Sequence, residues 1–558
     1  MALRVWVADC MRKIFRDDAA PRSEGCVELW AARGERVDAQ IVLRSDRVLA
    51  GLAVALPNLK GPRGASIPGS SIRVYFVGYV PIAFNTSQTD VQELAHQAPA
   101  EFPDPLLDDP LPLLAADINQ PVWITVAVPA DCAPGEYAGV VTVRAGRDRE
   151  TVPVRLHVWP LRLPVERHLW LTNWFWARPV SQYYGFEMYS AQYWEWVEKA
   201  AINLADHRQN MILTPVCSLV KTTCDGDGWR YDYTNLDRWI RIFDRHGVAD
   251  LIEGEHLGGR MGDWNSPFGF LPFSVTERDG STITLPRVPL GDQARQRLMR
   301  DFLAHLRDHL VRRGWYSRFI LHQADEPVAA NQDSYRELAQ FVRGVLPDVR
   351  RIDAVMGQGC DDCLEIRVPQ LQEVGEDSRG KSGELWFYTC LAPRGPYPNR
   401  FVDQPLFKTR IIHWFNWRYG ATGYLHWGYN WWRKWQGGGA MVNPWMTTTG
   451  GGEEGADSGA QRLPPGDPFI VYPGRADFCN SLRWEMVRRG VEDYEYLWML
   501  EQRAAGLPSR SIRRRRINAF LAGLRRGPLK SHSEYTRDPA DLETARHAIA
   551  RLLMDTAS

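Results

Sequence analysis

The sequence lacks the features that mark several specialised classes of protein. Lysine plus arginine number 67 and aspartate plus glutamate number 67, so the 558-residue chain carries no formal net charge. A dedicated nucleic-acid binder normally shows a basic excess, and this balance argues against one. No run approaches the roughly 18 uninterrupted apolar residues of a membrane span, and Lys13, Arg16 and Asp17 interrupt any signal-peptide core at the start. We expect no nucleic-acid partner, no membrane span, and a cytoplasmic protein or one secreted or periplasmic after signal removal.

Cysteine is scarce and scattered. The nine cysteines are an odd number, and only Cys360 and Cys363 are close in sequence. Secreted domains stapled by disulfides carry dense and even sets of cysteines. A structural zinc site needs four ligands, and no second Cys-x-x-Cys or His-x-x-x-His pair follows. These residues are therefore expected to be ordinary thiols.

One nucleotide-binding pattern is present without its setting. Gly375–Ser382 matches GxxxxGK[ST] in full and includes Lys381. A P-loop follows a strand and opens a helix whose N-terminus receives the phosphates. Here the match runs into the strand-like segment ELWFYTC, and Glu376 and Asp377 would place negative charge beside a phosphate. We expect Lys381 to bind no phosphate.

Residues 1–163 have the pattern of a β-sandwich domain. Short alternating runs such as SIRVYFVGYV, PVWITVAVP and VPVRLHVWP are separated by glycine, proline and aspartate turns. The turn at 131–137 contains Pro134, which fixes φ, and Gly135, which supplies the flexible position. The segment Pro160–Pro164 ends this domain.

From residue 164 the pattern changes to strands that alternate with helices. Leu298, Phe302, Leu306 and Leu310 recur at helical spacing after Asp292, a suitable N-cap. Eight short apolar runs qualify as strands: 168–175, 210–216, 249–254, 318–326, 350–357, 363–371, 384–390 and 422–428. Their number predicts an α/β fold, a (β/α)8 TIM-like barrel over residues 164–500. A doubly wound sheet is the structural rival, but no GxGxxG follows the first run.

Two stretches after the eighth run have less definite patterns. The glycine-rich stretch 436–467 is equally compatible with a lid over the barrel and with an insertion that has no role. Residues 501–558 are predicted to form a C-terminal helical segment. It is rich in arginine, and a short basic run of this kind is usually a solvated helix face.

The strongest candidate for chemistry is the pair Asp325 and Glu326, followed by Pro327, at the end of the fourth predicted strand. The C-terminal ends of barrel strands form the active-site face. Neighbours in a regular strand point to opposite faces, so both carboxylates reach one pocket only if the strand ends at the pair. Pro327 suits such an end because it cannot donate to a ladder. The alternative is a pair of capping carboxylates on a loop.

The second candidate is a cluster of tryptophans. Seven of the 23 tryptophans fall within 32 residues: Trp414, Trp417, Trp427, Trp431, Trp432, Trp435 and Trp445. Indole planes bind the apolar C–H faces of sugar rings, while polar neighbours such as Arg410, His426 and Asn430 bond the hydroxyls. Part of this cluster is expected to be core packing instead.

At this point the residues resemble a known family. Segment 384–432, the strand end at Asp325-Glu326-Pro327 and segment 467–497 are together similar to glycoside hydrolase family 123 and its close relatives. The N-terminal segment containing AARGERVDAQIVL resembles that family's accessory domain. The resemblance implies an exo-acting β-N-acetylgalactosaminidase on a (β/α)8 barrel, which retains configuration by substrate-assisted (oxazolinium) catalysis. It also implies a glycan or glycoconjugate substrate and no metal or organic cofactor. The oligomeric state is left open.

The same resemblance implies roles for five residues. Asp325, ionised, would hold the substrate's acetamide N–H, and Glu326, protonated, would act as general acid and then as base. Tyr388 would bond the acetamide carbonyl oxygen, Trp427 would stack under the ring, and Asn430 would bond a hydroxyl. The alternatives are a glycosidase with a carboxylate nucleophile on a different sugar, and a carbohydrate-binding protein without catalysis.

Overall fold

The computed structural model describes residues 3–21, 25–226, 228–357, 359–378, 383–435, 439–451 and 463–555. Lys381, with the end of the GxxxxGK[ST] match, lies outside the described residues, as do 436–438 and 452–462 of the glycine-rich stretch. The chain forms two compact units. Unit 1 consists of Met1–His168, Arg394–Arg418 and Asn430–Ser558, and unit 2 of Leu169–Pro393 and Tyr419–Tyr429.

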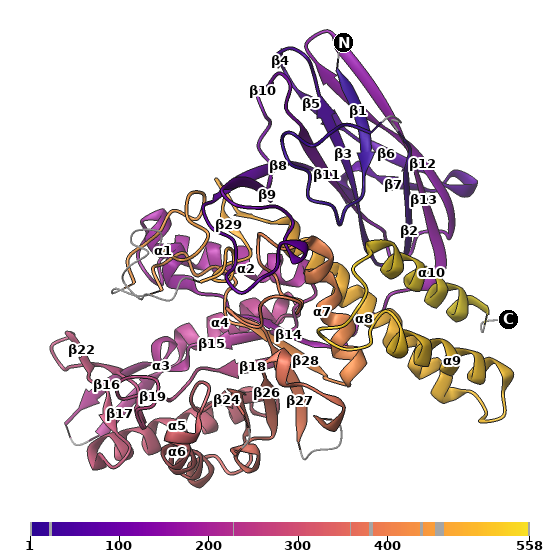
Figure 1. Ribbon diagram of the computed structural model, residues 1–558. Helices are drawn as coiled ribbons and strands as arrows, with labels where there is room; N and C mark the ends of the chain where they lie inside the picture. Colours follow the sequence, from indigo (N-terminus) through magenta and orange to yellow (C-terminus); the bar gives the residue numbers. More distant parts are fainter. Residues whose placement is uncertain are drawn as a thin grey trace. The chain divides into compact units, whose positions relative to one another are not determined.

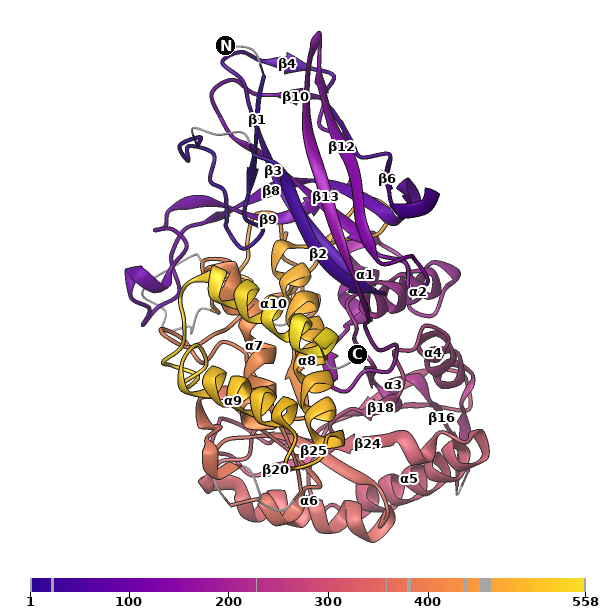
Figure 2. The same cartoon turned by 90° about the vertical axis from the view of Figure 1, so that its right-hand side faces the viewer.

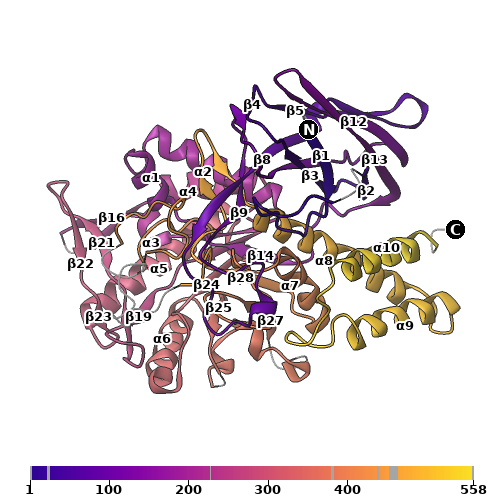
Figure 3. The same cartoon turned by 45° about the horizontal axis from the view of Figure 1, so that its top comes forward.

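The N-terminal part of unit 1 is a β-sandwich, as the sequence predicted (Figure 3). One sheet has five strands in the order β1 (Arg4–Ala8), β3 (Arg36–Arg44), β11 (Gln120–Ala127), β8 (Ile72–Ile82) and β9 (Ala100–Leu107). The other has six strands in the order β2 (Val27–Arg33), β13 (Asp148–Arg162), β12 (Gly135–Ala145), β6 (Asn58–Lys60) and β7 (Ser66–Pro68), with β5 (Ala53–Ala55) also paired to β12.

The alternating sequence explains this arrangement. Along β13, Val152, Val154, Leu156 and Val158 are buried while the residues between them are not. Successive side chains of a strand point to opposite faces, so these four form one apolar face. They belong to a single hydrophobic cluster with residues of the five-stranded sheet such as Ile41. The two sheets therefore share one core.

The remainder of unit 1 is mainly helical. Its helices are α7 (Leu406–Tyr419), α8 (Leu482–Gly506), α9 (Ile512–Arg526) and α10 (Pro539–Asp555). The hydroxyl of Ser481 caps α8 by accepting from the backbone N–H of Trp484 at 3.1 Å. Both α9 and α10 pack against α8 (Figure 2), so the predicted C-terminal helices are confirmed.

Unit 2 is a barrel of eight parallel strands that follow one another in chain order (Figure 1). They are β14 (Trp170–Asn173), β15 (Met211–Thr214), β18 (Leu251–Gly254), β24 (Phe319–His322), β25 (Arg350–Val355), β26 (Ile366–Pro369), β27 (Glu384–Tyr388) and β28 (Gly423–His426). From β15 to β28, each barrel strand pairs with the next one along the chain, and β28 pairs with β14. The predicted barrel is confirmed.

The barrel has one seam, between β14 and β15, which are not adjacent in the described ladder. Side-chain amides bridge it. Asn210 Oδ1 accepts from the backbone N–H of Leu171 at 2.9 Å, and Gln209 Oε1 accepts from that of Asn173 at 2.9 Å. Both amides are completely buried. They satisfy backbone groups that a ladder would otherwise pair.

The helices of unit 2 are α1 (Ala177–Tyr184), α2 (Ala191–Asp206), α3 (Val216–Leu219), α4 (Thr234–Arg245), α5 (Gln293–Arg313) and α6 (Gln332–Val345). Helix α5 begins as the sequence indicated, because the Asp292 carboxylate accepts from Arg295 N at 2.8 Å. It ends at Gly314, whose φ of 73° is left-handed. In the part of the chain that the structure describes, no helix is long and apolar enough to cross a membrane.

Small sheets extend the connections from β15 to β18 and from β18 to β24. One sheet contains β16 (Lys221–Asp225), β17 (Gly228–Asp232), β21 (Phe273–Thr276) and β22 (Thr282–Leu285). Another contains the hairpin of β19 (Gly258–Arg260) and β20 (Phe268–Phe270), with β23 (Val288–Pro289) beside it. The β19–β20 hairpin follows the third barrel strand and therefore rises from the C-terminal end of the barrel, where active sites of this fold lie.

Candidate active site

The carboxylate pair lies just beyond the C-terminal end of the fourth strand, where the sequence predicted it. Strand β24 ends at His322, and Asp325 and Glu326 follow on a short loop. Glu326 has a φ of 47°, a left-handed conformation that a residue with a side chain seldom adopts. Its backbone N–H donates to the carbonyl of Ala354 on β25 at 3.1 Å. The loop therefore holds a strained residue in place, which is a common property of active sites.

Arg260 clamps the backbone of the pair. Its Nη1 donates to the carbonyl oxygen of Asp325 at 3.1 Å, and its Nη2 to that of Glu326 at 2.6 Å. The same side chain donates through Nε to the carbonyl of Trp264 at 2.9 Å. Because the planar guanidinium has fixed donor directions, these bonds set the orientation of both peptide groups. These bonds go to backbone carbonyls and do not engage the carboxylate groups of the pair.

The environment of the pair favours the protonated forms. Asp325 is exposed, and Glu326 is half-buried. The surrounding protein and the negative charge of Glu326 raise the pKa of Asp325 to about 8, against the opposing effect of Arg260. Burial also raises the pKa of Glu326, while a hydrogen bond from Tyr388 opposes the shift. Repulsion between the two carboxylates is mutual, so the pair retains a proton near neutral pH.

Tyr388, at the end of β27, is the second residue that contacts the pair directly. Its hydroxyl donates to Glu326 Oε1, and the side chain is buried. Gln370 Nε2 donates to the same hydroxyl at 3.4 Å. The sequence placed Tyr388 at the substrate's acetamide. In this structure, which holds no substrate, its hydroxyl bonds Glu326, and the role at the acetamide stays a prediction.

A buried charge network lies among the strands that lead to the pair. His322 on β24 contacts two carboxylates: its Nδ1 is 3.0 Å from Asp353 Oδ1 and its Nε2 is 2.7 Å from Glu253 Oε1. All three side chains are completely buried. Burial alone would lower the pKa of His322, but the two carboxylates outweigh it and raise the pKa to about 9. An imidazole that donates from both nitrogens is the protonated form.

Asp353 ties this network to the loop that carries the pair. Its carboxylate accepts from the backbone N–H groups of Gln323 at 3.1 Å and Ala324 at 3.2 Å. It also accepts from the hydroxyl of Tyr335 at 2.7 Å. Glu253 is held in turn by the indole N–H of Trp174 at 2.8 Å. The network thus fixes the residues that immediately precede Asp325.

Three members of this region have metal-ligating atoms close together. One ligand atom from each of His256, His322 and Asp353 lies within 4.8 Å of the others. Both nitrogens of His322 already contact carboxylates, and a protonated imidazole cannot bind a metal. His256 Nε2 lies 3.6 Å from Asp353 Oδ1, and burial holds the pKa of His256 well below its usual value. The arrangement fits a hydrogen-bonded charge network better than a metal centre.

The predicted sugar-binding residues fall in different places. Trp427 is half-buried and packs against a hydrophobic cluster of the barrel interior that includes Tyr388. Trp176 Nε1 donates to its carbonyl at 2.8 Å. Asn430 is completely buried and belongs to unit 1 rather than unit 2. The structure therefore groups Trp427 with Tyr388 and the pair in one unit, and Asn430 stays a prediction.

Part of the tryptophan cluster is core, as the sequence analysis allowed. Trp414, Trp417 and Trp432 are buried, and the indole N–H of Trp414 donates to Asp493 at 2.9 Å. Arg410, which the sequence suggested as a partner for sugar hydroxyls, is completely buried and pairs with Asp493 at 2.7 Å. That suggestion is wrong because the guanidinium is already engaged inside unit 1.

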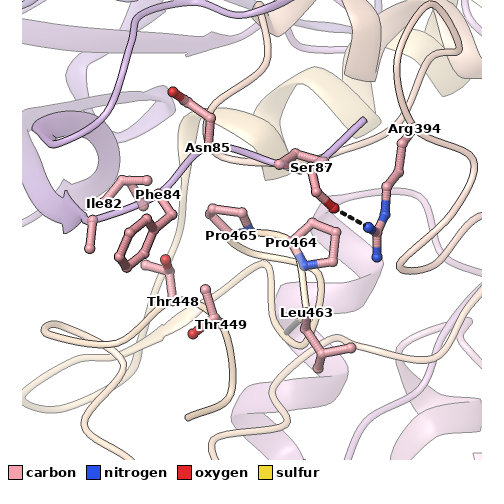
Figure 4. Close-up of a pocket in the computed structure, with 12 residues that line it drawn as sticks. Ile82, Phe84, Asn85, Ser87, Arg394, Thr448, Thr449, Leu463, Pro464 and Pro465 are labelled. Atoms are coloured by element: carbon pink, nitrogen blue, oxygen red, sulfur yellow. Dashed lines mark hydrogen bonds between the residues drawn. The ribbon is translucent and has the colours of Figure 1, made fainter. Parts of the chain in front are cut away.

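One cavity, with a volume of about 390 Å³, is lined by residues of unit 1. Figure 4 shows the Arg394 guanidinium bonded to the Ser87 hydroxyl at its edge, with Phe84, Thr448 and Pro465 also lining it. The predicted site residues are not among the described residues that line this cavity. The carboxylate pair belongs to unit 2.

Sequence reasoning did not identify Arg260, Glu253, His322 or Asp353. Three of them had a signal: Glu253, His322 and Asp353 each interrupt a short apolar run that became a buried strand. Ionisable residues are almost never fully buried unless paired, so such interruptions predict a network. Arg260 had no such signal, because its role depends on the course of the β19–β20 hairpin.

Two family models match the chain. One, described as the catalytic domain of glycoside hydrolase 123, matches residues 174–500, and one described as the glycoside hydrolase 123 N-terminal domain matches residues 15–145. No curated protein sequence matches the chain.

The whole fold is also found among solved structures. A family 123 glycoside hydrolase from Clostridium perfringens, described for glycolipid glycan hydrolysis, has a TM-score of 0.76 at 14% identity, covering 100% of this chain and 98% of that one. A family 5 glycoside hydrolase from Bacteroides vulgatus has a TM-score of 0.31 at 12% identity, covering 60% of this chain and 67% of that one. The β-glucuronidase 3 of Bacteroides uniformis has a TM-score of 0.30 at 9% identity, with 89% and 52% covered.

The catalytic-domain model covers more than half of the chain, and its match contains the carboxylate pair and Tyr388. The resemblance found in the sequence is thereby confirmed, and the chain belongs to glycoside hydrolase family 123.

Proposed function

We propose that this glycoside hydrolase is an exo-acting β-N-acetylgalactosaminidase that retains anomeric configuration by substrate-assisted catalysis. The observation that carries the proposal is the placement of both carboxylates side by side on one loop. A retaining enzyme with its own nucleophile sets two carboxylates about 5 Å apart, flanking the scissile bond. Because Asp325 and Glu326 are consecutive residues, both approach the sugar from one side. This arrangement suits a general acid beside a residue that stabilises positive charge, and not an acid and a nucleophile on opposite sides of the scissile bond.

The two steps balance without a nucleophile from the protein. In the first, the carbonyl oxygen of the substrate's 2-acetamido group bonds to the anomeric carbon as the glycosidic bond breaks. Glu326 gives its proton to the departing oxygen, and Asp325 stabilises the oxazolinium by accepting from its N–H. In the second, water attacks the anomeric carbon, the ring of the intermediate opens, and Glu326 takes the proton from the water.

The protonation of the pair has to change when substrate binds. Without substrate, Asp325 has its pKa raised to about 8, so it holds a proton near neutral pH. An acetamide N–H that donates to Asp325 favours its ionised form, because hydrogen bonds to a carboxylate lower its pKa. The proton of the pair then resides on Glu326, where the first step needs it. Substrate binding therefore sets up the acid.

Tyr388 and Trp427 complete the pocket in this proposal. The Tyr388 hydroxyl, bonded to Glu326 without substrate, turns to the acetamide carbonyl oxygen when a sugar is bound. The exposed part of Trp427 stacks on the apolar face of the sugar ring. The glycan of a glycoconjugate is the proposed source of the sugar, consistent with the glycolipid glycan hydrolysis described for the Clostridium perfringens relative.

A panel of glycosides tests the proposal. The β-N-acetylgalactosaminide, the β-N-acetylglucosaminide and the β-galactoside of one aglycone are compared by kcat/KM, with N-acetylgalactosaminide expected to be the best substrate. Successive fluorination of the acetamide methyl weakens the carbonyl oxygen as a nucleophile and should lower kcat/KM stepwise. A thiazoline mimic of the intermediate should inhibit competitively.

Other outcomes favour the alternatives. Cleavage of the plain galactoside with a trapped covalent adduct on a carboxylate identifies a glycosidase with its own nucleophile. Binding of sugars without release of any of them identifies a carbohydrate-binding protein. In either case the substrate-assisted proposal is wrong.

A further inference from the structure

An ordered hairpin presents a tryptophan to solvent beside the carboxylate pair. Trp264 lies at the tip between β19 and β20 and is 46% exposed. The tip is not a loose loop. Met261 N donates to the carbonyl of Pro267 at 2.9 Å, and the carboxylate of Asp263 accepts from Asn265 N at 3.0 Å. Asn331 Nδ2 donates to the carbonyl of Trp264 itself at 3.2 Å.

One guanidinium connects this indole to the catalytic loop. The Cζ atom of Arg260 lies over the Trp264 ring, 3.8 Å from its centroid. The same guanidinium donates to the carbonyl oxygens of Asp325 and Glu326. Arg260 stacks on one face of the indole, while 46% of Trp264 remains exposed to solvent. Trp264 is thus linked to the backbone of the pair through a single guanidinium.

We propose that Trp264 is the platform of a subsite for the sugar on the leaving-group side of the scissile bond. This inference rests on the proposed exo-acting hydrolase. Such an enzyme binds the terminal sugar against the pair, and no sugar precedes it, so a site farther along the rim can meet only the aglycone. The ligand class is a hexose whose apolar C–H face stacks on the indole. A preformed platform loses little conformational entropy when it binds.

A purely structural role for Trp264 has a different consequence. Stacking of Arg260 on an exposed ring stabilises the hairpin modestly. If that were its whole function, removing the ring would disturb Arg260 and the pair beneath it. Every substrate would then be affected to the same extent, whatever its aglycone. A subsite instead makes the effect depend on the presence of the second sugar.

The test compares two substrates that differ only at this position. One is the methyl β-glycoside of N-acetylgalactosamine, whose aglycone is too small to reach the platform. The other is a disaccharide of N-acetylgalactosamine β-linked to galactose. Aryl glycosides are avoided because an aromatic aglycone would itself stack on the indole. Released N-acetylgalactosamine is quantified by chromatography, and kcat/KM is measured for the full-length wild type, Trp264→Ala and Trp264→Phe.

We expect Trp264→Ala to lower kcat/KM for the disaccharide roughly tenfold, mainly through KM, and to change the methyl glycoside less than about twofold. Trp264→Phe should retain part of the preference. Val311→Ala is the matched control, because Val311 is also an exposed apolar residue (54%). It lies near the C-terminal end of α5, which leads into the start of β24, whereas the pair follows the end of that strand. This control should change neither substrate.

Equal losses on both substrates, or no loss on either, would overturn the subsite. Failure of the proposed function is distinguished from this by the wild type alone. If the wild type releases a different terminal sugar, the same comparison is made with the methyl glycoside and the disaccharide of that sugar. A loss confined to its disaccharide then still supports the platform.

Discussion

Replacing His322 by glutamine tests the charge network that underlies the carboxylate pair. The buried ring contacts Asp353 and Glu253, and the two carboxylates overcome the effect of burial and raise its pKa from 6.5 to about 9. A raised pKa stabilises the fold at low pH: the contribution is complete below pH 6.5 and is lost as the pH rises through about 9. A pKa difference of this size corresponds to roughly 3 kcal/mol.

Glutamine can still donate and accept hydrogen bonds but has no proton that titrates in this range. The free energy of unfolding is measured by urea denaturation at a series of pH values for the wild type and for His322→Gln. The difference between the two proteins should be largest near pH 6, with the wild type the more stable. The excess should shrink by roughly 3 kcal/mol by about pH 9.5. His305→Gln is the matched control, since its side chain is 55% exposed on α5. It should run parallel to the wild type.

Two results would contradict this reasoning. If the wild type and His322→Gln lose stability in parallel as the pH rises, the imidazolium between Asp353 and Glu253 is not the species present. If a chelator lowers the melting temperature of the wild type but not of the variant, the cluster with His256 holds a metal ion instead of a shared proton.

The carboxylates and Tyr388 give two further predictions. Glu326→Gln should lower kcat/KM by about 10²–10⁴-fold on substrates with poor leaving groups and much less on activated aryl glycosides. Asp325→Asn should lower kcat/KM similarly on the two kinds of substrate. If the two variants show the same dependence on the leaving group, the assigned roles are wrong. Tyr388→Phe removes a hydrogen bond that holds the pKa of Glu326 down, so the loss of kcat/KM at high pH should move to higher pH. Asp325→Asn removes a negative charge beside Glu326 and should move the loss of kcat/KM at high pH to lower pH. If Tyr388→Phe and Asp325→Asn shift this loss in the same direction, Glu326 is not the acid.

The fold was predictable from the sequence because its strands are short apolar runs at regular intervals. All eight runs contain a barrel strand, and Asp292 caps α5 as its position indicated. The seam between β14 and β15 was not predictable. Gln209 and Asn210 are polar residues at the start of the second apolar run. Nothing in the sequence shows that their side-chain amides bond the backbone of β14 in place of strand-to-strand hydrogen bonds.

The carboxylate pair was predictable from the residues alone because its members are neighbours in the chain, whereas Tyr388, which contacts Glu326, came from the family resemblance. Asp325 and Glu326 could be found because two carboxylates and a proline follow an apolar run. Arg260 and Trp264 precede them by some sixty residues and meet them only through the β19–β20 hairpin. Side-chain to backbone contacts of this kind leave no mark in composition or spacing. The prediction for Arg410 was wrong for a related reason. Its position near tryptophans in the sequence suggested sugar binding, but its guanidinium pairs with Asp493 inside the core.

The geometry of the pair also explains why a two-residue motif is not sufficient for a site. Consecutive residues of an extended chain point to opposite faces, and the loop overcomes this by placing Glu326 at a φ of 47°. A sparsely populated backbone conformation costs about 1–3 kcal/mol and persists only when its surroundings determine it. Here the Arg260 clamp on two carbonyls, the bond from Glu326 N to Ala354 and the hold of Asp353 on the preceding residues do so. A chain with the same dipeptide but without these three contacts would let the loop relax, and the two carboxylates would no longer share one pocket.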